Sequence, residues 1–109
     1  MMKTELVKVF DSVSEARDRI PDGTQCLVRI DQKNICLVRL GQEFYAVENE
    51  CAHMGHSLVK GKLNPFHEIV CPWHSYRFNL ITGEESAFRC RKLKVFPVVL
   101  NSEGLLIKV

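Results

Sequence analysis

Two pairs of cysteine and histidine stand out because thiolates and imidazoles together bind metals. Cys51 and His53 form a C-x-H motif, and Cys71 and His74 form a C-x-x-H motif, with seventeen residues between His53 and Cys71. With four histidines in 109 residues, a given offset from a cysteine holds one by chance at a rate of only about 0.04. Two thiolates and two imidazoles on two loops suit either zinc or an iron–sulfur cluster. The spacing alone leaves both open.

The residues that flank the two pairs also follow a pattern. They comprise Tyr45 to Asn49 before the first pair, Gly55 and Leu58 after it, Pro72 within the second, Phe78 to Gly83 after that, and Phe96-Pro97-Val98 with Glu103-Gly104 near the end. In these features the chain resembles the Rieske family, and in particular the small Rieske ferredoxins of ring-hydroxylating dioxygenases and the small subunits of nitrite reductases. The resemblance covers nearly the whole chain.

The resemblance implies one Rieske-type 2Fe-2S cluster per chain. Cys51 and Cys71 would bind one iron, His53 and His74 the other, and two sulfides would bridge them. Such a cluster is neutral when both irons are ferric and carries one negative charge after one-electron reduction. Protein and sulfide fill every position around the irons, so no open position remains for a substrate. The resemblance therefore implies an electron carrier and not an enzyme.

Two departures from the respiratory members concern the cluster loops. Those members join the loops by a disulfide, where this chain has His56 and Trp73. They also donate serine and tyrosine hydroxyls to cluster sulfurs, where this chain has Tyr76 and Phe78. Because hydrogen bonds to sulfur stabilise the reduced cluster, we expect a potential toward the lower end of the Rieske range of about −150 to +300 mV.

Two further departures concern the backbone. Many family members cover the cluster with a proline-containing loop, whereas residues 84–90 contain no proline. Ser75 follows the ligand histidine where glycine is common, and serine is less tolerant of a left-handed backbone. We therefore expect the shielding of the site and the turn after His74 to differ from those of the family.

The rest of the chain is predicted to form short strands separated by turns. Alternating or β-branched apolar residues predict strands at Leu6–Phe10, Thr24–Ile30, Ile35–Leu40, Phe44–Glu48, Glu68–Val70, Leu93–Leu100 and Leu105–Val109. Turn-forming residues lie between most of them, as in antiparallel proteins. One short helix is predicted from Ser12, at capping-box spacing from Glu15, to Ile20, where Pro21 would stop it.

These elements predict a single all-β domain over residues 1–109. The resemblance implies the Rieske fold, an antiparallel β-sandwich with an inserted cluster-binding subdomain. We expect the basal sheets to comprise about 1–48 and 84–109, and the cluster-binding tip to comprise about 49–83. A chain of 109 residues has little room for a second core.

Composition and charge exclude several classes of protein. The net charge of +2 is too small to favour nucleic acid or an anionic membrane as a partner. Neither a membrane-spanning stretch nor a signal peptide is recognisable, which predicts a cytoplasmic protein. Five cysteines is an odd number, and in that compartment metal binding or free thiols are favoured over disulfides.

Other residues near the motifs receive structural interpretations. His56 and His67 are interpreted as loop residues rather than ligands. Three cysteines without metal-type spacing are interpreted as buried, reduced thiols: Cys26, Cys36 and Cys90. Trp73 and Tyr76 are expected to pack and exclude water, and Met54 to cap the first loop.

Charged residues near the motifs have two interpretations, a solvated surface or a docking surface. The basic run comprises Arg89, Arg91, Lys92 and Lys94, and alternation would place Arg89 and Arg91 on one strand face. The acidic residues beside the motifs are Glu48, Glu50, Glu84 and Glu85. Sequence does not decide which set would meet a partner.

Three functions follow from these observations. The first is a monomeric one-electron carrier that passes electrons from a flavin-containing reductase to a terminal oxygenase or reductase. The second is an electron-transfer subunit of assimilatory nitrite reductase. The third belongs to another class, a structural β module pinned by zinc. An oxygenase would need a further domain for its mononuclear iron.

Overall fold

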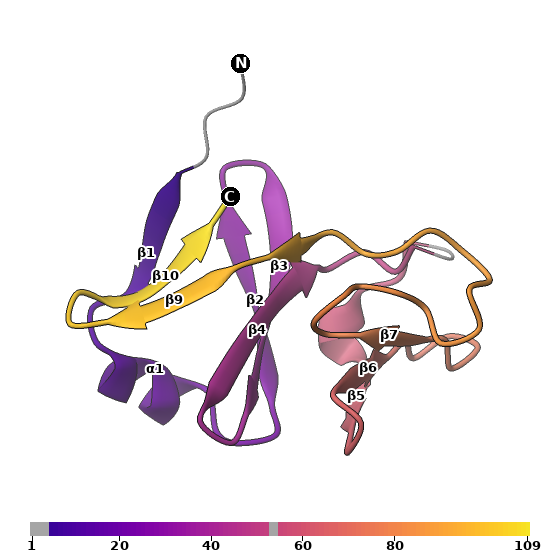
Figure 1. The fold of residues 1–109 in the computed structure, drawn as a ribbon, viewed down its shortest axis with the longest axis horizontal. Helices are drawn as coiled ribbons and strands as arrows, with labels where there is room; N and C mark the ends of the chain where they lie inside the picture. The colour runs from indigo at the N-terminus through magenta and orange to yellow at the C-terminus, as the bar shows by residue number, and fades with distance from the viewer. Residues whose placement is uncertain (1–4, 53–54) are drawn as a thin grey trace.

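The computed structural model describes residues 5–52 and 55–109, which form three antiparallel sheets (Figure 1). The first basal sheet contains, in spatial order, β1 (Leu6–Phe10), β10 (Gly104–Lys108) and β9 (Val98–Asn101). The second contains β2 (Gln25–Ile30), β3 (Lys33–Leu40), β4 (Glu43–Glu48) and β8 (Val95–Phe96). A small sheet at the other end contains β5 (Lys62–Asn64), β6 (Glu68–Val70) and β7 (Arg77–Asn79). The all-β prediction is confirmed.

The one α-helix, α1 (Val13–Arg19), lies where the sequence predicts it. The hydroxyl of Ser12 accepts a hydrogen bond from the Glu15 backbone N–H at 3.0 Å, which satisfies one of the donors left free at a helix start. Ile20 ends the helix in an extended conformation, and Pro21 follows. Ala16 is the buried residue of this helix and packs into the basal core.

Strand β3 holds the two halves of the molecule together because both of its faces are buried. Ile35 and Leu37 point into a basal core between the two basal sheets. Cys36 and Val38, on the opposite face, belong to a second core that also contains buried residues of the tip. All four side chains are fully buried. The continuous apolar run in the sequence is therefore the signature of a strand that is covered on both sides.

A polar contact links the same sheet to the tip. The amide of Gln25, at the start of β2, donates hydrogen bonds to the carbonyls of Val59 and Gly61 at 3.0 and 2.8 Å. These acceptors lie at the end of the 3₁₀ turn η1 (Leu58–Lys60). One side chain thus fixes the start of the small sheet against the basal half.

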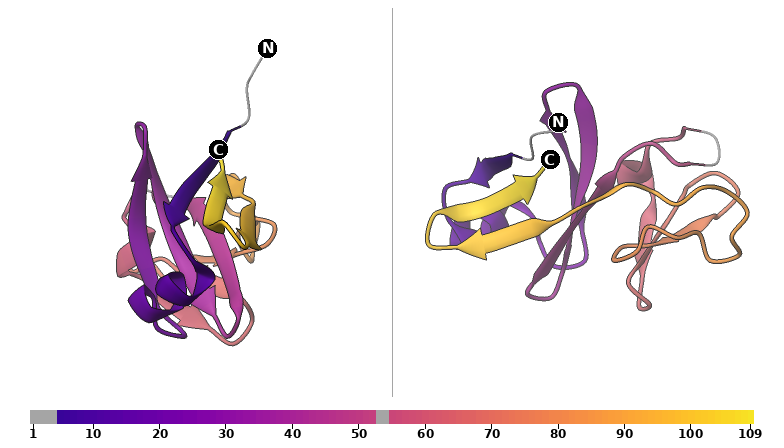
Figure 2. Two further views of the ribbon diagram at one scale, coloured as in Figure 1. Left: turned by 90° about the vertical axis from the view of Figure 1, so that its left-hand side faces the viewer. Right: turned by 45° about the horizontal axis from the view of Figure 1, so that its top comes forward.

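The predicted strand over Leu93–Leu100 is wrong as a single element. It is divided at Pro97 into β8, which pairs with β4, and β9, which pairs with β10. Proline has no N–H to donate to a sheet, so the chain leaves one sheet there and enters the other. Figure 2 shows this segment crossing from the tip side to the basal half.

Three short elements of the tip are not predicted from the sequence, namely β5, β7 and η1. Each has three residues, and none contains two adjacent β-branched residues, as the predicted strand β6 does at Ile69 and Val70. Gly83, in contrast, matches the family pattern and proves to be a point of close approach. It has a φ of +81°, and a Cβ there would lie 2.2 Å from the carbonyl oxygen of Leu93. The division of the chain into basal and tip segments at residues 49 and 84 stays a prediction.

Gly83→Ala is expected to lower the free energy of unfolding by about 3 kcal/mol, because it adds a backbone clash to left-handed strain. Gly41→Ala is the matched control, since Gly41 also has positive φ (+62°), but a Cβ at this residue would meet no atom within 4 Å. It should cost about 1 kcal/mol. Denaturant titration of both variants measures the difference, and equal losses would contradict the close approach.

Candidate metal centre

The two motif segments form loops that are closed in the same way. In the first ligand loop, residues 51–56, the Cys51 N–H donates to the carbonyl of His56 at 2.7 Å. In the second ligand loop, residues 71–76, the Cys71 N–H donates to the carbonyl of Tyr76 at 2.8 Å. Each cysteine therefore begins a six-residue loop whose last carbonyl returns to it, and β6 leads directly into Cys71.

The structure brings the two motif cysteines together. Cys51 and Cys71 are 2% and 1% exposed, and their thiols lie within hydrogen-bonding reach of one another. Burial raises the pKa of the Cys71 thiol, and the neighbouring Cys51 thiol raises it further, while the backbone N–H of Trp73 opposes this by donating to the sulfur. A metal must displace these protons, as is usual for thiolate ligands.

The motif histidines are placed differently. His74 is exposed, at the outer side of the second ligand loop. His53 and Met54 lie outside the described residues, so the predicted roles of both stay predictions. Within residues 5–52 and 55–109, no three His, Cys, Asp or Glu side chains are gathered as a metal site requires. The described part of the site is therefore the buried thiol pair.

The turn after His74 keeps a left-handed backbone without glycine. His74 has a φ of +65° and Ser75 a φ of +55°. Residues with a Cβ adopt this region only at a cost. Serine takes the conformation that favours glycine, so the departure from the family pattern is a cost in strain, and the expected difference in geometry from the family stays a prediction.

The positions where respiratory members have a disulfide are linked here by stacked rings. The imidazole of His56 and the indole of Trp73 stack with centroids 5.1 Å apart and planes at 30°. Trp73 remains 51% exposed. Trp73 therefore packs as expected, against a residue of the other ligand loop, but its exposure does not support the expected role in excluding water.

Sequence reasoning missed the role of Asn49 in the first ligand loop. Asn49 is 5% exposed, and its side-chain amide donates to the Ser57 hydroxyl at 2.8 Å and accepts from the Val59 N–H at 3.0 Å. Its backbone carbonyl accepts from the Leu58 N–H. Asn49 thereby ties both ends of the first ligand loop together. Its position two residues before Cys51 is the one available signal.

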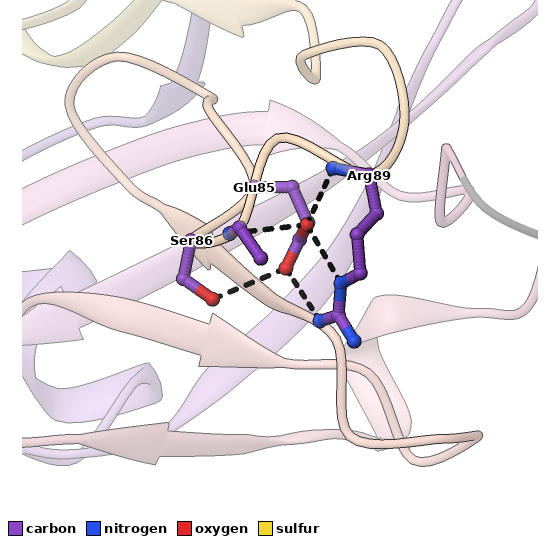
Figure 3. A network of polar contacts seen from close by, with 4 residues as sticks. Glu85, Ser86 and Arg89 are labelled. Atoms are coloured by element: carbon purple, nitrogen blue, oxygen red, sulfur yellow. Dashed lines mark hydrogen bonds and ion pairs between the residues drawn. The ribbon is translucent and has the colours of Figure 1, made fainter.

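Glu85 is a second polar residue whose role differs from the expectation. Its interpretation as a docking charge is wrong, because it is 1% exposed. Its carboxylate accepts five hydrogen bonds, three of them from the backbone N–H, Nε and Nη2 of Arg89 at 2.9, 3.0 and 2.6 Å (Figure 3). The side chain of Arg89 lowers the pKa of Glu85 from its ordinary value of 4.5 to about 2.

The basic run is likewise corrected. Residues 89–94 form no strand, so Arg89 and Arg91 do not share a strand face. Arg89 pairs with Glu85, and Arg91 pairs with Glu48 at the end of β4. The predicted solvated strand is therefore a loop, and both of its arginines form ion pairs. Lys92 and Lys94 remain exposed.

The remaining cysteines and histidine lie mostly as predicted. All five cysteines are free thiols. Cys36 is fully buried, which raises the pKa of its thiol to about 12, whereas Cys26 and Cys90 are only partly buried. His67 lies exposed on the turn between β5 and β6.

In the described residues no helix is long and apolar enough to cross a membrane.

Ser75→Gly is expected to raise the free energy of unfolding by about 0.5–1 kcal/mol, because relief of left-handed strain exceeds the added freedom of the unfolded chain. Thermal unfolding of the cluster-loaded protein measures the effect. Ser102→Gly, in the turn between β9 and β10, is a control outside the positive-φ residues. A loss of stability in Ser75→Gly would contradict the strain.

Glu85 predicts a specific dependence of stability on pH. A carboxyl whose folded pKa is lowered stabilises the fold fully above its unfolded value of 4.5, and the contribution is lost as the pH falls toward about 2. We expect it to be about 1–2 kcal/mol, because the Arg89 side chain is 44% exposed and water screens the pair. Thermal unfolding of wild type and Glu85→Gln should therefore differ most at about pH 7, and the difference should shrink below pH 4.5 as the pH falls toward about 2. A gap that is constant with pH would contradict the assignment.

Comparison with known proteins agrees with this architecture. The Rieske [2Fe-2S] domain matches residues 12–97. The ferredoxin component of the naphthalene 1,2-dioxygenase/salicylate 5-hydroxylase systems of Ralstonia sp is 32% identical over 93 residues, which are 84% of this chain and 88% of that protein.

Two solved structures extend the similarity to the fold. The ferredoxin of carbazole 1,9a-dioxygenase from Nocardioides aromaticivorans superposes with a TM-score of 0.81 at 28% identity, covering 94% of this chain and 95% of that one. A chain from the complex of reduced oxygenase and oxidised ferredoxin in carbazole 1,9a-dioxygenase gives 0.75 at 29% identity, covering 95% and 91%. On these matches, which replace the zinc alternative, the chain belongs to the Rieske [2Fe-2S] domain family.

Proposed function

We propose that this chain is a ferredoxin that carries single electrons from a flavin-containing reductase to a terminal oxygenase. The observation that carries the proposal is the buried pair of thiols from two loops, of which the second loop also contains the exposed His74. Similar proteins are ferredoxin components of dioxygenase systems, and one is solved in complex with its oxygenase. A carrier needs its metal shielded on one side and within reach of a partner on the other.

The donor chemistry fits a Rieske cluster. The thiols of Cys51 and Cys71 lie together and out of water, as two ligands to one iron require. We assign His53 and His74 to the other iron, from the C-x-H and C-P-x-H motifs. When bound, the cluster would accept and release one electron, which changes one of its irons between the ferric and the ferrous state.

The chain's own residues set the conditions for this exchange. The apolar tip core around Cys51 and Cys71, which includes Leu58, Ile69 and Phe78, keeps water from the thiol side. Because His74 is exposed, an electron would cross only a short distance between the cluster and a docked protein. Backbone hydrogen bonds close both ligand loops. They limit the movement of the loops when the cluster gains or loses an electron.

The polarity around the sulfurs favours a low reduction potential. Phe78 is fully buried and has no hydroxyl to donate to a cluster sulfur. A sulfur that lacks this donor leaves the reduced cluster less stabilised. The cytoplasmic location, the reductase and the monomeric state belong to the same proposal.

His74→Ala and His53→Ala should abolish the visible absorption and the electron paramagnetic resonance signal of a histidine-ligated cluster, and reduce electron transfer to a terminal oxygenase to background, because each removes an iron ligand. Circular dichroism should still show the basal sheets, whose core contains buried residues of segments 16–46 and 96–107. His67→Ala is the matched control, since His67 is also exposed with positive φ (+59°). Retention of the full spectrum in either ligand variant would refute the assignment.

A further inference from the structure

The segment after the small sheet is ordered without an apolar anchor at its outermost part. This third loop, residues 84–92, begins alongside β7, where the Ser86 N–H donates to the Arg77 carbonyl at 2.8 Å and Glu85 bridges to Phe78. Beyond this point Ser86, Ala87, Phe88 and Arg89 are all exposed, and Phe88 is 74% exposed with a φ of +55°. Burial of apolar side chains cannot hold these four residues in place.

The Glu85 carboxylate supplies the missing anchor. It is buried under the loop and accepts hydrogen bonds from the Ser86 hydroxyl, from the Ala87 and Arg89 N–H groups, and from the guanidinium of Arg89 (Figure 3). Its backbone carbonyl accepts from the Phe88 N–H at 3.0 Å. A buried carboxylate is costly unless it is fully bonded, so losing any donor favours opening of the whole turn.

The guanidinium of Arg89 connects this turn to the second ligand loop. Two of its nitrogens bond the two oxygens of Glu85, which fixes the plane of the group. Its central carbon lies 3.7 Å from the centre of the Tyr76 ring, within the range of a cation–π contact. Glu85 thus determines where Arg89 lies, and Arg89 covers Tyr76.

Tyr76 in turn closes the loop that contains a metal-binding cysteine. Its carbonyl accepts the Cys71 N–H at 2.8 Å, and its side chain packs against the tip core that contains both motif cysteines. A continuous path of contacts therefore runs from Glu85 through Arg89 and Tyr76 to Cys71. Arg91 of the third loop pairs instead with Glu48 of β4, and its side chain is 60% exposed. This ion pair is not part of the path.

We propose that Glu85 is a positioning residue for the metal centre, which holds the third loop against the second ligand loop through Arg89 and Tyr76 and so slows loss of the cluster to solvent. The proposal rests on the proposed function only in that a cluster is bound. It does not depend on which proteins donate or accept the electron.

The test compares two rates in cluster-loaded protein. One is chymotrypsin cleavage after Phe88, identified by mass spectrometry, which reports opening of the third loop. The other is loss of visible absorption of the oxidised cluster in excess EDTA, which binds the released ferric iron and so reports escape of the metal. Glu85→Gln and Arg89→Ala should each raise both rates about tenfold, as expected for loss of about one charge-assisted hydrogen bond. The double variant should be no faster than the faster single variant, because both changes break one path.

Two matched pairs separate positioning from general damage. Tyr76→Leu, which removes the ring beneath Arg89, should raise the rate of cluster loss more than Tyr76→Phe, which keeps the ring. Arg91→Ala should leave both rates unchanged. Arg89→Lys keeps the positive charge but loses the bidentate contact with Glu85, and should also raise both rates. It serves as the test if Glu85→Gln does not fold.

Two results would overturn the positioning role alone: faster cleavage with an unchanged rate of cluster loss, or an equal rise in Arg91→Ala. Wild-type protein that contains no iron or sulfide would overturn the proposed function as well. That result is seen before any variant is compared, so the two failures are distinguishable.

Discussion

The structure depends on holding two thiols together, out of water, from segments twenty residues apart. The second basal sheet meets this requirement because β3 is buried on both faces, so that the tip packs on a surface already fixed by the basal core. β4 leads toward Cys51, and β6 leads directly into Cys71. Burial favours the protonated thiols, so binding of a metal at this site must release protons.

The contacts around this thiol pair are individually weak and act on short loops. Respiratory members of the family use a disulfide between the loops, whereas this chain stacks His56 on Trp73. The loop that contains proline in many members is ordered here around the Glu85 carboxylate. Exposed ion pairs contribute little, but a buried carboxylate with five hydrogen bonds constrains its loop strongly. Polar and aromatic contacts have thus taken the place of covalent and proline restraints.

Much of the fold is predictable because the signals are local and repeated. The two-faced run at Ile35 to Val38, the capped helix after Ser12 and the two Cys–His motifs need no tertiary information. The three-residue strands of the tip form only because neighbours provide hydrogen bonds, and Pro97 divides a run that is apolar throughout. The role of Glu85 escapes sequence reasoning because its burial depends on backbone donors that a sequence does not display. Its spacing of four residues from Arg89 is the one available signal. The ligand role of His53 stays a prediction.

The central claim is that the two ligand loops hold a Rieske cluster that carries one electron. The most direct measurement is to quantify iron, acid-labile sulfide and zinc in freshly purified protein and to record the electron paramagnetic resonance spectrum after chemical reduction. The account predicts two irons and two sulfides per chain, in keeping with a [2Fe-2S] domain, and the low average g of a histidine-ligated cluster. One zinc per chain, with neither sulfide nor signal even after anaerobic reconstitution with iron and sulfide, would contradict it.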